Sequence, residues 1–397
     1  MRISHNQMFR TALAGIQQQQ SRLSVTEQQL VYGKKLLSPA DDPTAAARAI
    51  TLRQSINDLV QLNRNADIAE AALQLSDQTL GEIQSLLESI RTVALDAFNG
   101  SNSAVDFQDF GIDLAEKLDF LLDLGNSRDG SGNYLFSGSR QQVPPFVANA
   151  DGTYGWQGDQ QEQSLRVGPS RVLKLLPSGF DLFASVPTGN GTVSSAHDSS
   201  NLGSGLLGTV TMNGTGYDGA DYEIVFSGPD AYDVVNVTTG ATVATAQPFE
   251  AGATISFAGI DVVIEGAPEA GDRFSFGPSA QRNVLETVRQ LTETLQGADG
   301  SNETDIYNTL TRSIEDLDRA MERVELLQVR AGNRLAVLDD IRAANETFDL
   351  RYREQLSLLE DLDMVEAASL LTAQADALEI AQAAFARIQG LSLFNFI

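Results

Sequence analysis

A narrow row of apolar residues runs along the N-terminal segment, and glutamine and other polar residues fill the positions between its members. A seven-residue apolar repeat is typical of a helix that packs against a single partner helix. The spacing therefore predicts an N-terminal helix with one apolar seam to cover. The members of this row are Phe9, Ile16, Leu23, Leu30 and Leu37.

A longer helical pattern follows a break at residues 39–43, where two prolines flank Asp41 and Asp42, either of which can cap a new helix. Two apolar rows, offset by three and four residues, continue for about six heptads and predict a helix on the order of 50 residues. Asn99-Gly100 should end this helix, and a shorter one should stop at Gly125. The two rows comprise Leu52, Leu59, Ala66, Leu73, Leu80, Leu87 and Ala94, and Leu62, Ala69, Ser76, Ile83, Ile90 and Ala97.

The C-terminal third has no proline after Pro278, and its apolar residues again follow helical spacing. Ser279 can cap a first helix, which Gly297 should end. From Asn302 onward the sequence has no proline, and an apolar stripe at helical spacing runs from Ile306 to Ile341. A final seven-residue row is flanked by alanines that let another helix approach closely, and it comprises Met364, Leu371, Leu378 and Phe385.

The middle of the chain, residues 141–278, is rich in Gly, Thr and Val and alternates with period two, which predicts strands. Thr239-Gly240 and Asn213-Gly214 suit hairpin turns. Because both ends of this segment continue into helices, we expect an antiparallel β domain inserted between two helical blocks. The expected strands are 221–227, 232–238, 241–246, 254–257, 260–265 and 273–276.

These patterns predict an α+β protein in which long N- and C-terminal helices form a coiled coil or helical bundle. We expect five parts: an N-terminal assembly helix, the first half of a helical rod domain, the inserted β domain, the second half of the rod, and a C-terminal assembly helix. Their expected ranges are 1–43, 44–140, 141–278, 279–350 and 351–397.

The composition and net charge exclude several classes of partner. The 397 residues include 27 Lys and Arg against 53 Asp and Glu, a formal net charge of −26. Such a chain is repelled by nucleic acid and by anionic lipid headgroups, so we expect neither as a partner. No run of about 18 apolar residues is present, and no membrane-spanning helix is expected. No cleavable signal peptide is visible either, so the chain is expected to stay in the cytoplasm or to leave it without cleavage.

Candidate chemistry is sparse. The chain has no cysteine and only two histidines, His5 and His197, neither with an evident catalytic partner, so zinc chemistry is nearly excluded. Acidic Gly-rich loops at 129–132 and 218–221 lack the EF-hand spacing and are predicted to be turns. No P-loop motif of the form GxxxxGK[ST] is present, so nucleotide binding is not expected. We therefore predict no catalytic residues, no metal site, no cofactor and no enzymatic activity.

The sharper hypothesis concerns the apolar rows. For the inner rows, an ordinary intramolecular helical core is favoured. The outer rows lie at the two ends of the chain, which finishes in an apolar tail, and a soluble monomer seldom leaves such a surface in water. An assembly interface is therefore predicted at Phe9, Ile16, Leu23, Leu30, Leu37, Met364, Leu371, Leu378, Phe385, Ile388, Leu391, Leu393 and Phe394.

Several segments resemble a known family. These are MRIS at 1–4 with QMF at 7–9, GKKLLSPADDP at 33–43, GNYLFSG at 132–138 and IQGLSL at 388–393. The chain thereby resembles the flagellar hook-associated protein 3 family, the hook–filament junction proteins of the flagellin superfamily. The ADDP and YLFSG stretches are shared with flagellins, and the opening residues favour the junction family.

The resemblance implies a structural subunit without enzymatic activity. Such proteins are exported unfolded through the flagellar type III pathway to the extracellular flagellum, after a dedicated export chaperone has bound their C-terminal region. Their terminal helices pair and line the central channel, which implies that Phe9, Ile16, Leu23 and Leu30 meet Leu371, Leu378, Phe385 and Ile388. A second helical layer makes the lattice contacts with other copies, and the β domain faces outward. The implied neighbours are hook-associated protein 1 and flagellin.

The sequence is also compatible with two alternatives. The chain could be flagellin, the filament subunit, which shares the terminal helices. The β domain could also be a glycan-binding or enzymatic module carried on a filament protein.

Overall fold

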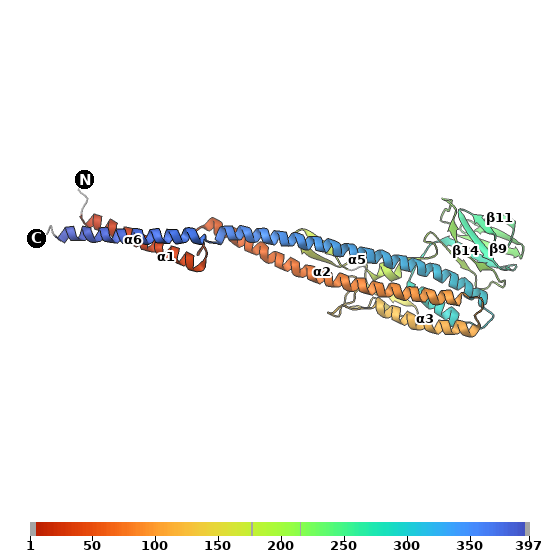
Figure 1. The fold of residues 1–397 in the computed structure, drawn as a ribbon. Coiled ribbons are helices and arrows are strands. Elements are labelled where there is room, and N and C mark those ends of the chain that lie inside the picture. Colours follow the sequence, from red (N-terminus) through yellow and green to blue (C-terminus); the bar gives the residue numbers. More distant parts are fainter. Residues whose placement is uncertain (1–4, 176–177, 215, 394–397) are drawn as a thin grey trace. The chain divides into compact units, whose positions relative to one another are not determined.

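The computed structural model describes residues 5–175, 178–214 and 216–393. The chain forms two compact units, which are described separately: unit 1 consists of Met1–Arg64 with Asp340–Ile397, and unit 2 of Asn65–Asp339. Two long helices, α2 (Pro43–Ala97) and α5 (Glu303–Glu360), contribute residues to both. Figure 1 traces the elements along the chain, from α1 in red to α6 in blue.

Unit 1 pairs the two ends of the chain through α1 (His5–Tyr32) and α6 (Met364–Leu393). The rings of Phe9 and Phe385 lie with their centroids 5.0 Å apart, and the Thr26 hydroxyl donates to Gln374 Oε1 at 2.9 Å. These contacts occur in opposite order along the two helices, so α1 and α6 are antiparallel. The prediction that the terminal helices pair within the chain is thus confirmed for α1 and α6.

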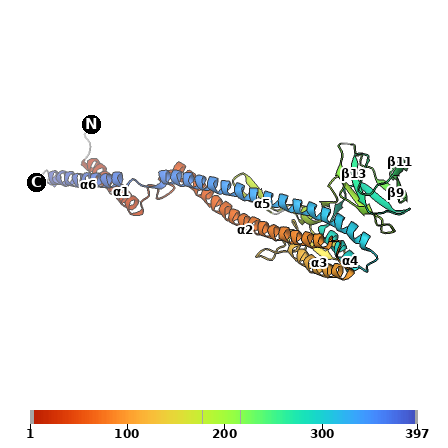
Figure 2. The same cartoon turned by 45° about the vertical axis from the view of Figure 1, so that its right-hand side comes forward.

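The helical part of unit 2 contains α3 (Ala104–Gly125), α4 (Val284–Gln296) and the parts of α2 and α5 that belong to this unit. α2 and α5 run side by side here (Figures 1 and 2). α3 begins in a capping box between Ser103 and Asp106, and Asn283 caps α4 by accepting from the Leu285 amide at 3.0 Å. Fully buried side chains of this layer include Leu73, Leu80, Ile83, Ile90, Phe107, Leu114, Leu121, Leu291, Leu295, Ile306, Leu310 and Leu317.

Short elements connect the helices to the β region. β1 (Phe146–Ala148) pairs with β2 (Tyr154–Trp156), and β3 (Ser164–Gly168) pairs with β4 (Arg171–Lys174). A π-helical turn, η1, follows at Phe180–Ala184. A further pair, β5 (Val186–Pro187) with β15 (Gln281–Arg282), joins the two chain segments that enter and leave the β region.

A β sandwich, residues 193–278, fills the rest of unit 2. Its five-stranded antiparallel sheet has the order β11-β10-β9-β14-β6, and the second sheet has β13 between β12 and β7, with β8 also paired to β13. Aromatic and aliphatic side chains of both sheets form one core, as the period-two pattern requires. The strands are β6 (Val193–His197), β7 (Leu206–Leu207), β8 (Thr211–Met212), β9 (Tyr222–Gly228), β10 (Ala231–Asn236), β11 (Ala241–Pro248), β12 (Thr254–Phe257), β13 (Ile260–Glu265) and β14 (Arg273–Pro278).

The α+β class is confirmed, and so are several local predictions. α2 is 55 residues long and ends two residues before Asn99. α3 ends at Gly125, and Gly297 is the C-cap of α4. Each of the six expected strands has a counterpart, and 254–257 and 260–265 have the expected bounds. The Thr239-Gly240 turn joins the paired strands β10 and β11.

Two local predictions at helix ends are wrong. Leu37 does not extend the N-terminal helix, because α1 ends at Tyr32 and Gly33 takes a left-handed φ of +66°. Ser279 does not cap α4, because its hydroxyl donates to the Thr188 carbonyl at 2.7 Å while Asn283 serves as the cap.

The expected hairpin at Asn213-Gly214 is also wrong. The preceding strand β8 pairs with β13 and not with β9, the next strand along the chain. The Asn213 side chain donates to Asp261 Oδ1 at 2.9 Å, so it connects its segment to β13 instead.

Candidate assembly interface

Most of the predicted interface residues whose side chains the structure describes are half-buried. Ile16, Leu23 and Leu30 on α1, and Leu371, Leu378 and Phe385 on α6, are half-buried within the described pair of helices. Leu37 is half-buried in the connection after α1. Ile388, Leu391 and Leu393 belong to the helical backbone of α6, and Phe394 lies outside the described residues. The two heptad rows therefore face each other within one chain.

Among the predicted residues whose side chains the structure describes, Phe9 and Met364 stay open to solvent. Phe9 is 38% exposed although its ring contacts Phe385, and Met364 is 52% exposed at the start of α6. One partner helix therefore covers only part of the predicted surface.

A second apolar surface on the same helices was missed by the sequence reasoning. Val31 is 81% exposed, Val365 78% and Ile380 70%. On α6 a spacing of three and four residues joins Leu370, Ala373, Ala377 and Ile380, all exposed, and this spacing was a signal that could have revealed a second stripe. The heptad search found only the stripe that the other terminal helix covers.

Unit 1 also has an open apolar groove. A cleft of about 590 Å³ lies between the start of α2 and the end of α5. Leu358, 76% exposed, is on its wall. The lining residues are Ala47, Arg48, Thr51, Leu52, Gln355, Leu358 and Leu359.

An ionic joint holds the connections of unit 1 in place. The Glu360 side chain, 7% exposed, accepts from Lys34 Nζ at 2.8 Å and from an Arg53 guanidinium nitrogen at 2.7 Å. Burial raises the pKa of the Glu360 carboxyl, but the hydrogen bonds from the two cations outweigh burial and bring that pKa below its ordinary value. Two backbone hydrogen bonds connect the same segments. The Lys35 amide donates to the Glu360 carbonyl at 2.8 Å, and the Leu362 amide donates to the Gly33 carbonyl at 3.0 Å.

The two aspartates at 41 and 42 shape the turn before α2. Asp42 Oδ1 accepts from the amides of Thr44 and Ala45 at 3.0 and 2.9 Å, which makes it the helix cap. Asp41 Oδ2 accepts from the amides of Leu37 and Ser38 at 3.0 and 2.7 Å. The ADDP segment thus has a structural role in ending one helix connection and starting the next helix.

Side chains considered for catalysis are engaged in local structure. The Asp129 carboxylate accepts from the amides of Ser131 and Asn133, both at 2.8 Å, as in a tight turn. His197 Nε2 lies 2.5 Å from Asp305 Oδ1, which ties β6 to the start of α5. Among residues 5–175, 178–214 and 216–393, no group of three or more His, Cys, Asp or Glu is placed to hold a metal ion. Within the same ranges, no helix is long and apolar enough to cross a membrane.

Comparison with known proteins places these features in context. Residues 3–141 match the family model of the bacterial flagellin N-terminal helical region. Flagellar hook-associated protein 3 of Salmonella typhimurium is 28% identical over 186 residues, which is 47% of this chain and 58% of that protein. Flagellin of Serratia marcescens is 25% identical over 147 residues, 37% of this chain and 42% of that one. The chain therefore aligns with little more than half the length of the curated hook-associated relative.

Solved structures extend the similarity over more of the chain. FlgL of Xanthomonas campestris is 26% identical and superposes with a TM-score of 0.72, covering 77% of this chain and 99% of that one. Flagellar hook-associated protein 3 of Legionella pneumophila is 25% identical with a TM-score of 0.73, covering 78% of this chain and 98% of that one.

Proposed function

Since this chain belongs to the flagellar hook-associated protein 3 family of the flagellin superfamily, we propose that it is a non-enzymatic structural subunit of the hook–filament junction of the bacterial flagellum. Copies of the chain would assemble side by side into a ring or helical lattice. That lattice would join hook-associated protein 1 on the hook side to flagellin on the filament side.

The observation that carries this proposal is the large number of exposed hydrophobic side chains in the described part of unit 1. Its described part buries six hydrophobic side chains, which are Ala45, Ala49, Leu59, Leu62, Ile341 and Ala367. Against these stand fifteen large hydrophobic side chains that are exposed, among them Val31, Leu358 and Val365. Exposed apolar surface on this scale is typical of a protein–protein interface, and neighbouring subunits would cover it.

The route to the flagellum is part of the same proposal. We place the working site of the chain outside the cell and its export in the flagellar type III pathway, with an export chaperone on the C-terminal helix α6 before transport. The absence of cysteine agrees with this route, because no disulfide has to form or break along the way. The exposed stripe of α6, including Leu370 and Ile380, would be the surface that a chaperone shields.

Localisation on intact flagella tests the proposal. Detached flagella would be labelled with a gold-conjugated antibody raised against residues 141–278, the expected outward-facing β domain, and viewed by electron microscopy. The proposal predicts gold confined to the boundary between hook and filament. Gold along the entire filament would instead identify the chain as flagellin, and flagella without gold would overturn both assignments.

A further inference from the structure

The first third of α5 has two buried faces of opposite character. Ile306, Leu310 and Leu317 form an apolar face and are completely buried. A second face carries Asn308 and Asp316, which are 2% and 5% exposed although both are polar. Both views of the molecule place this end of α5 beside the β sandwich (Figures 1 and 2). Residues of the sandwich contact Asn308, and the chain segments just before and after the sandwich contact Asp316.

Asn308 and Arg312 bind the backbone of β7, an outer strand of the second sheet. Asn308 Oδ1 accepts from the Leu207 amide at 2.7 Å, and Asn308 Nδ2 donates to the Gly205 carbonyl at 3.1 Å. One turn further along, Arg312 Nη2 donates to the carbonyls of Gly208 and Leu207 at 3.1 and 3.3 Å. Helix side chains thus satisfy backbone groups that a sheet edge otherwise leaves open.

Two more side chains of α5 extend the contact on either side. Asp305 pairs with His197 of β6, as described above, and Asp316 Oδ1 accepts from the Gly189 amide at 2.9 Å. Asp316 Oδ2 also accepts from Arg282 Nη1 of β15 at 3.2 Å. Arg312 in addition donates to the Ser195 hydroxyl of β6. The contact therefore reaches from β6 across β7 to β15 and includes several hydrogen bonds and ion pairs.

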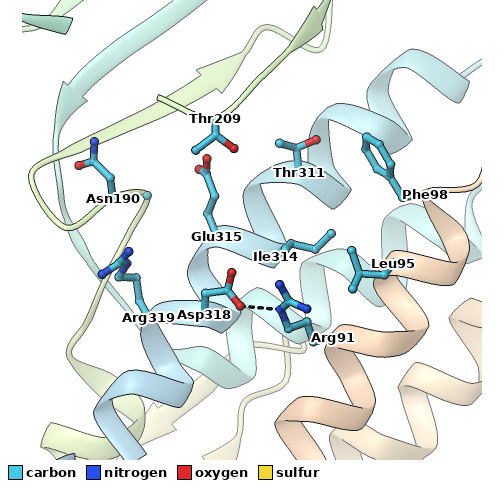
Figure 3. A pocket seen from close by; sticks show the side chains of 11 residues that line it. Arg91, Leu95, Phe98, Asn190, Thr209, Thr311, Ile314, Glu315, Asp318 and Arg319 are labelled. Carbon is cyan, nitrogen blue, oxygen red and sulfur yellow. Dashed lines mark hydrogen bonds and ion pairs between the residues drawn. The ribbon is translucent and has the colours of Figure 1, made fainter. Parts of the chain in front are cut away.

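The packing around this contact is loose in comparison with a protein core. A cleft of about 490 Å³ adjoins it at Ser195, Arg312 and Asp316. A second cleft, of about 370 Å³, lies on the side of Glu315, whose carboxylate points toward Thr209 in Figure 3. Within the described residues, Arg312 Nε and Glu315 Oε1 are buried without a hydrogen-bond partner. Water in these clefts can replace protein partners if the contact opens.

The β sandwich has a core of its own that does not include α5. That core is closed by side chains such as Phe226, Ile264 and Phe274, all at most 1% exposed, which come from both sheets. Removal of the polar contact would leave this core intact. The sandwich thus has its own apolar core, and hydrogen bonds and ion pairs of α5 lie beside it.

We propose that Asp305, Asn308, Arg312 and Asp316 form a polar latch that fixes the orientation of the β sandwich on the helices and that can open without unfolding either part. Polar groups lose little when water replaces their partners, whereas apolar contacts lose their driving force on separation, so a polar contact is suited to reversible opening. The latch is a property of the folded chain and does not rest on the proposed function.

The absence of cysteine allows a direct test by electron paramagnetic resonance on the full chain. Asp109→Cys on α3 and Thr245→Cys on β11 place two spin labels at exposed positions, one on the helices and one on the sandwich. The distribution of distances between the labels is then compared for the parent, for Arg312→Met and for Arg330→Met. Arg330 is an exposed arginine of the same helix and serves as the matched control.

The latch predicts a narrow distribution for the parent and the control and a broadened one for Arg312→Met. Thermal unfolding followed by circular dichroism should show that Arg312→Met keeps its folded structure. An unchanged distance distribution in Arg312→Met and in the milder variant Asp316→Asn would overturn the proposal. Loss of the β structure in both variants would overturn it too, because the contact would then be part of the sandwich fold.

Discussion

Units 1 and 2 treat apolar residues in opposite ways. In the described part of unit 2, aromatic residues such as Phe107, Phe136 and Phe274 are completely buried, and apolar cores are closed within the chain. In the described part of unit 1 no aromatic side chain is buried, and the largest buried side chains are Leu59, Leu62 and Ile341. The described part of unit 2 thus has closed apolar cores, whereas the described part of unit 1 has few buried apolar side chains and many exposed ones.

The same heptad pattern thus occurs in two kinds of packing. In unit 2, residues in the apolar rows of α2 and α5 are completely buried, with Leu80 and Leu317 as examples. In unit 1 the rows of α1 and α6 reach half-burial, with Leu23 and Leu371 as examples. On the proposed function, burial of these half-exposed rows against neighbouring subunits would contribute free energy to assembly.

The largest expected effect is on the free energy of unfolding, when an aromatic ring is removed from unit 2 or from unit 1. Phe107→Ala removes a completely buried ring from unit 2 and should lower the free energy of unfolding by about 3–5 kcal/mol. Phe385→Ala removes the partner of Phe9 in the half-open pair and should cost about 1 kcal/mol. Chemical denaturation followed by circular dichroism measures both. Equal losses would contradict the distinction between a closed unit and an open one.

The ionic joint of unit 1 should give the next largest effect. Glu360→Gln leaves the cations of Lys34 and Arg53 without their anion and should cost about 1.5–3 kcal/mol. Limited proteolysis across residues 33–42 detects the loosened connection. Glu354→Gln alters an exposed carboxylate of the same helix, and this variant should be cleaved at the same rate as the parent. If the two variants behave alike, the joint does not stabilise unit 1.

Adding a methyl group at two glycines also distinguishes the close packing of unit 2 from the open packing of unit 1. A Cβ on Gly111 of α3 would meet Gln296 Cγ at 2.7 Å and its amide nitrogen at 2.9 Å, so Gly111→Ala should destabilise unit 2 by about 1–3 kcal/mol. A Cβ on Gly15 of α1 would meet nothing within 4 Å, so Gly15→Ala should stabilise its helix by about 0.5–1 kcal/mol. Melting temperatures should move in opposite directions, and a shift of the same sign would refute the contrast.

The smallest expected effect is a difference in pH dependence. Burial raises the pKa of Glu315 and Asp316 above their ordinary values of 4.5 and 3.8, despite the nearby guanidinium groups of Arg312 and Arg282. The folded unit 2 therefore binds protons more readily than the unfolded chain, and its stability should rise as the pH falls from neutral toward those values. The pKa of Glu360 is lowered, so its contribution to unit 1 is present above its ordinary value of 4.5 and is lost as the pH falls below it.

Melting curves recorded from neutral pH down to about pH 4 resolve this difference. Glu315→Gln should flatten the rise in unit 2 and leave the acid loss in unit 1 unchanged. A rise that persists in this variant and in Asp316→Asn would mean that other groups cause it.

Much of the fold followed from local patterns. Proline-free heptad rows predicted α2, α5 and α6, and period-two alternation predicted the strands of the sandwich, because both signals arise from burial on one face. Helix ends were harder to predict. Ser279 and Asn283 are both good capping residues, and the choice between them depends on the pairing of β15, which occupies Gln281–Arg282, with β5, which is a tertiary property.

The candidate interface was only partly predictable. The rows through Ile16 and Leu378 were visible, but they turned out to cover each other within the chain. The exposed stripe through Leu370 and Ile380 has a less regular spacing and was missed. The polar latch was also hidden, because a charged residue such as Asp316 on a helix predicts a solvated face unless its neighbours in space are known.

The most direct test of the account compares exposed apolar residues of the two units in living cells. Two triple variants are introduced into a strain whose own copy of the gene has been deleted, and attached filaments are counted by electron microscopy. The first variant changes α1 of unit 1: Leu13→Asp, Val25→Asp and Tyr32→Asp. The control changes three exposed apolar positions of unit 2: Val172→Asp, Leu202→Asp and Val243→Asp.

The account predicts that the control strain carries normal filaments, because those residues are ordinary surface positions. The unit 1 variant should be exported and folded but should leave cells without attached filaments, since carboxylates would be buried against neighbouring subunits. Normal filaments on cells that carry the unit 1 variant would contradict the claim that unit 1 is completed by assembly.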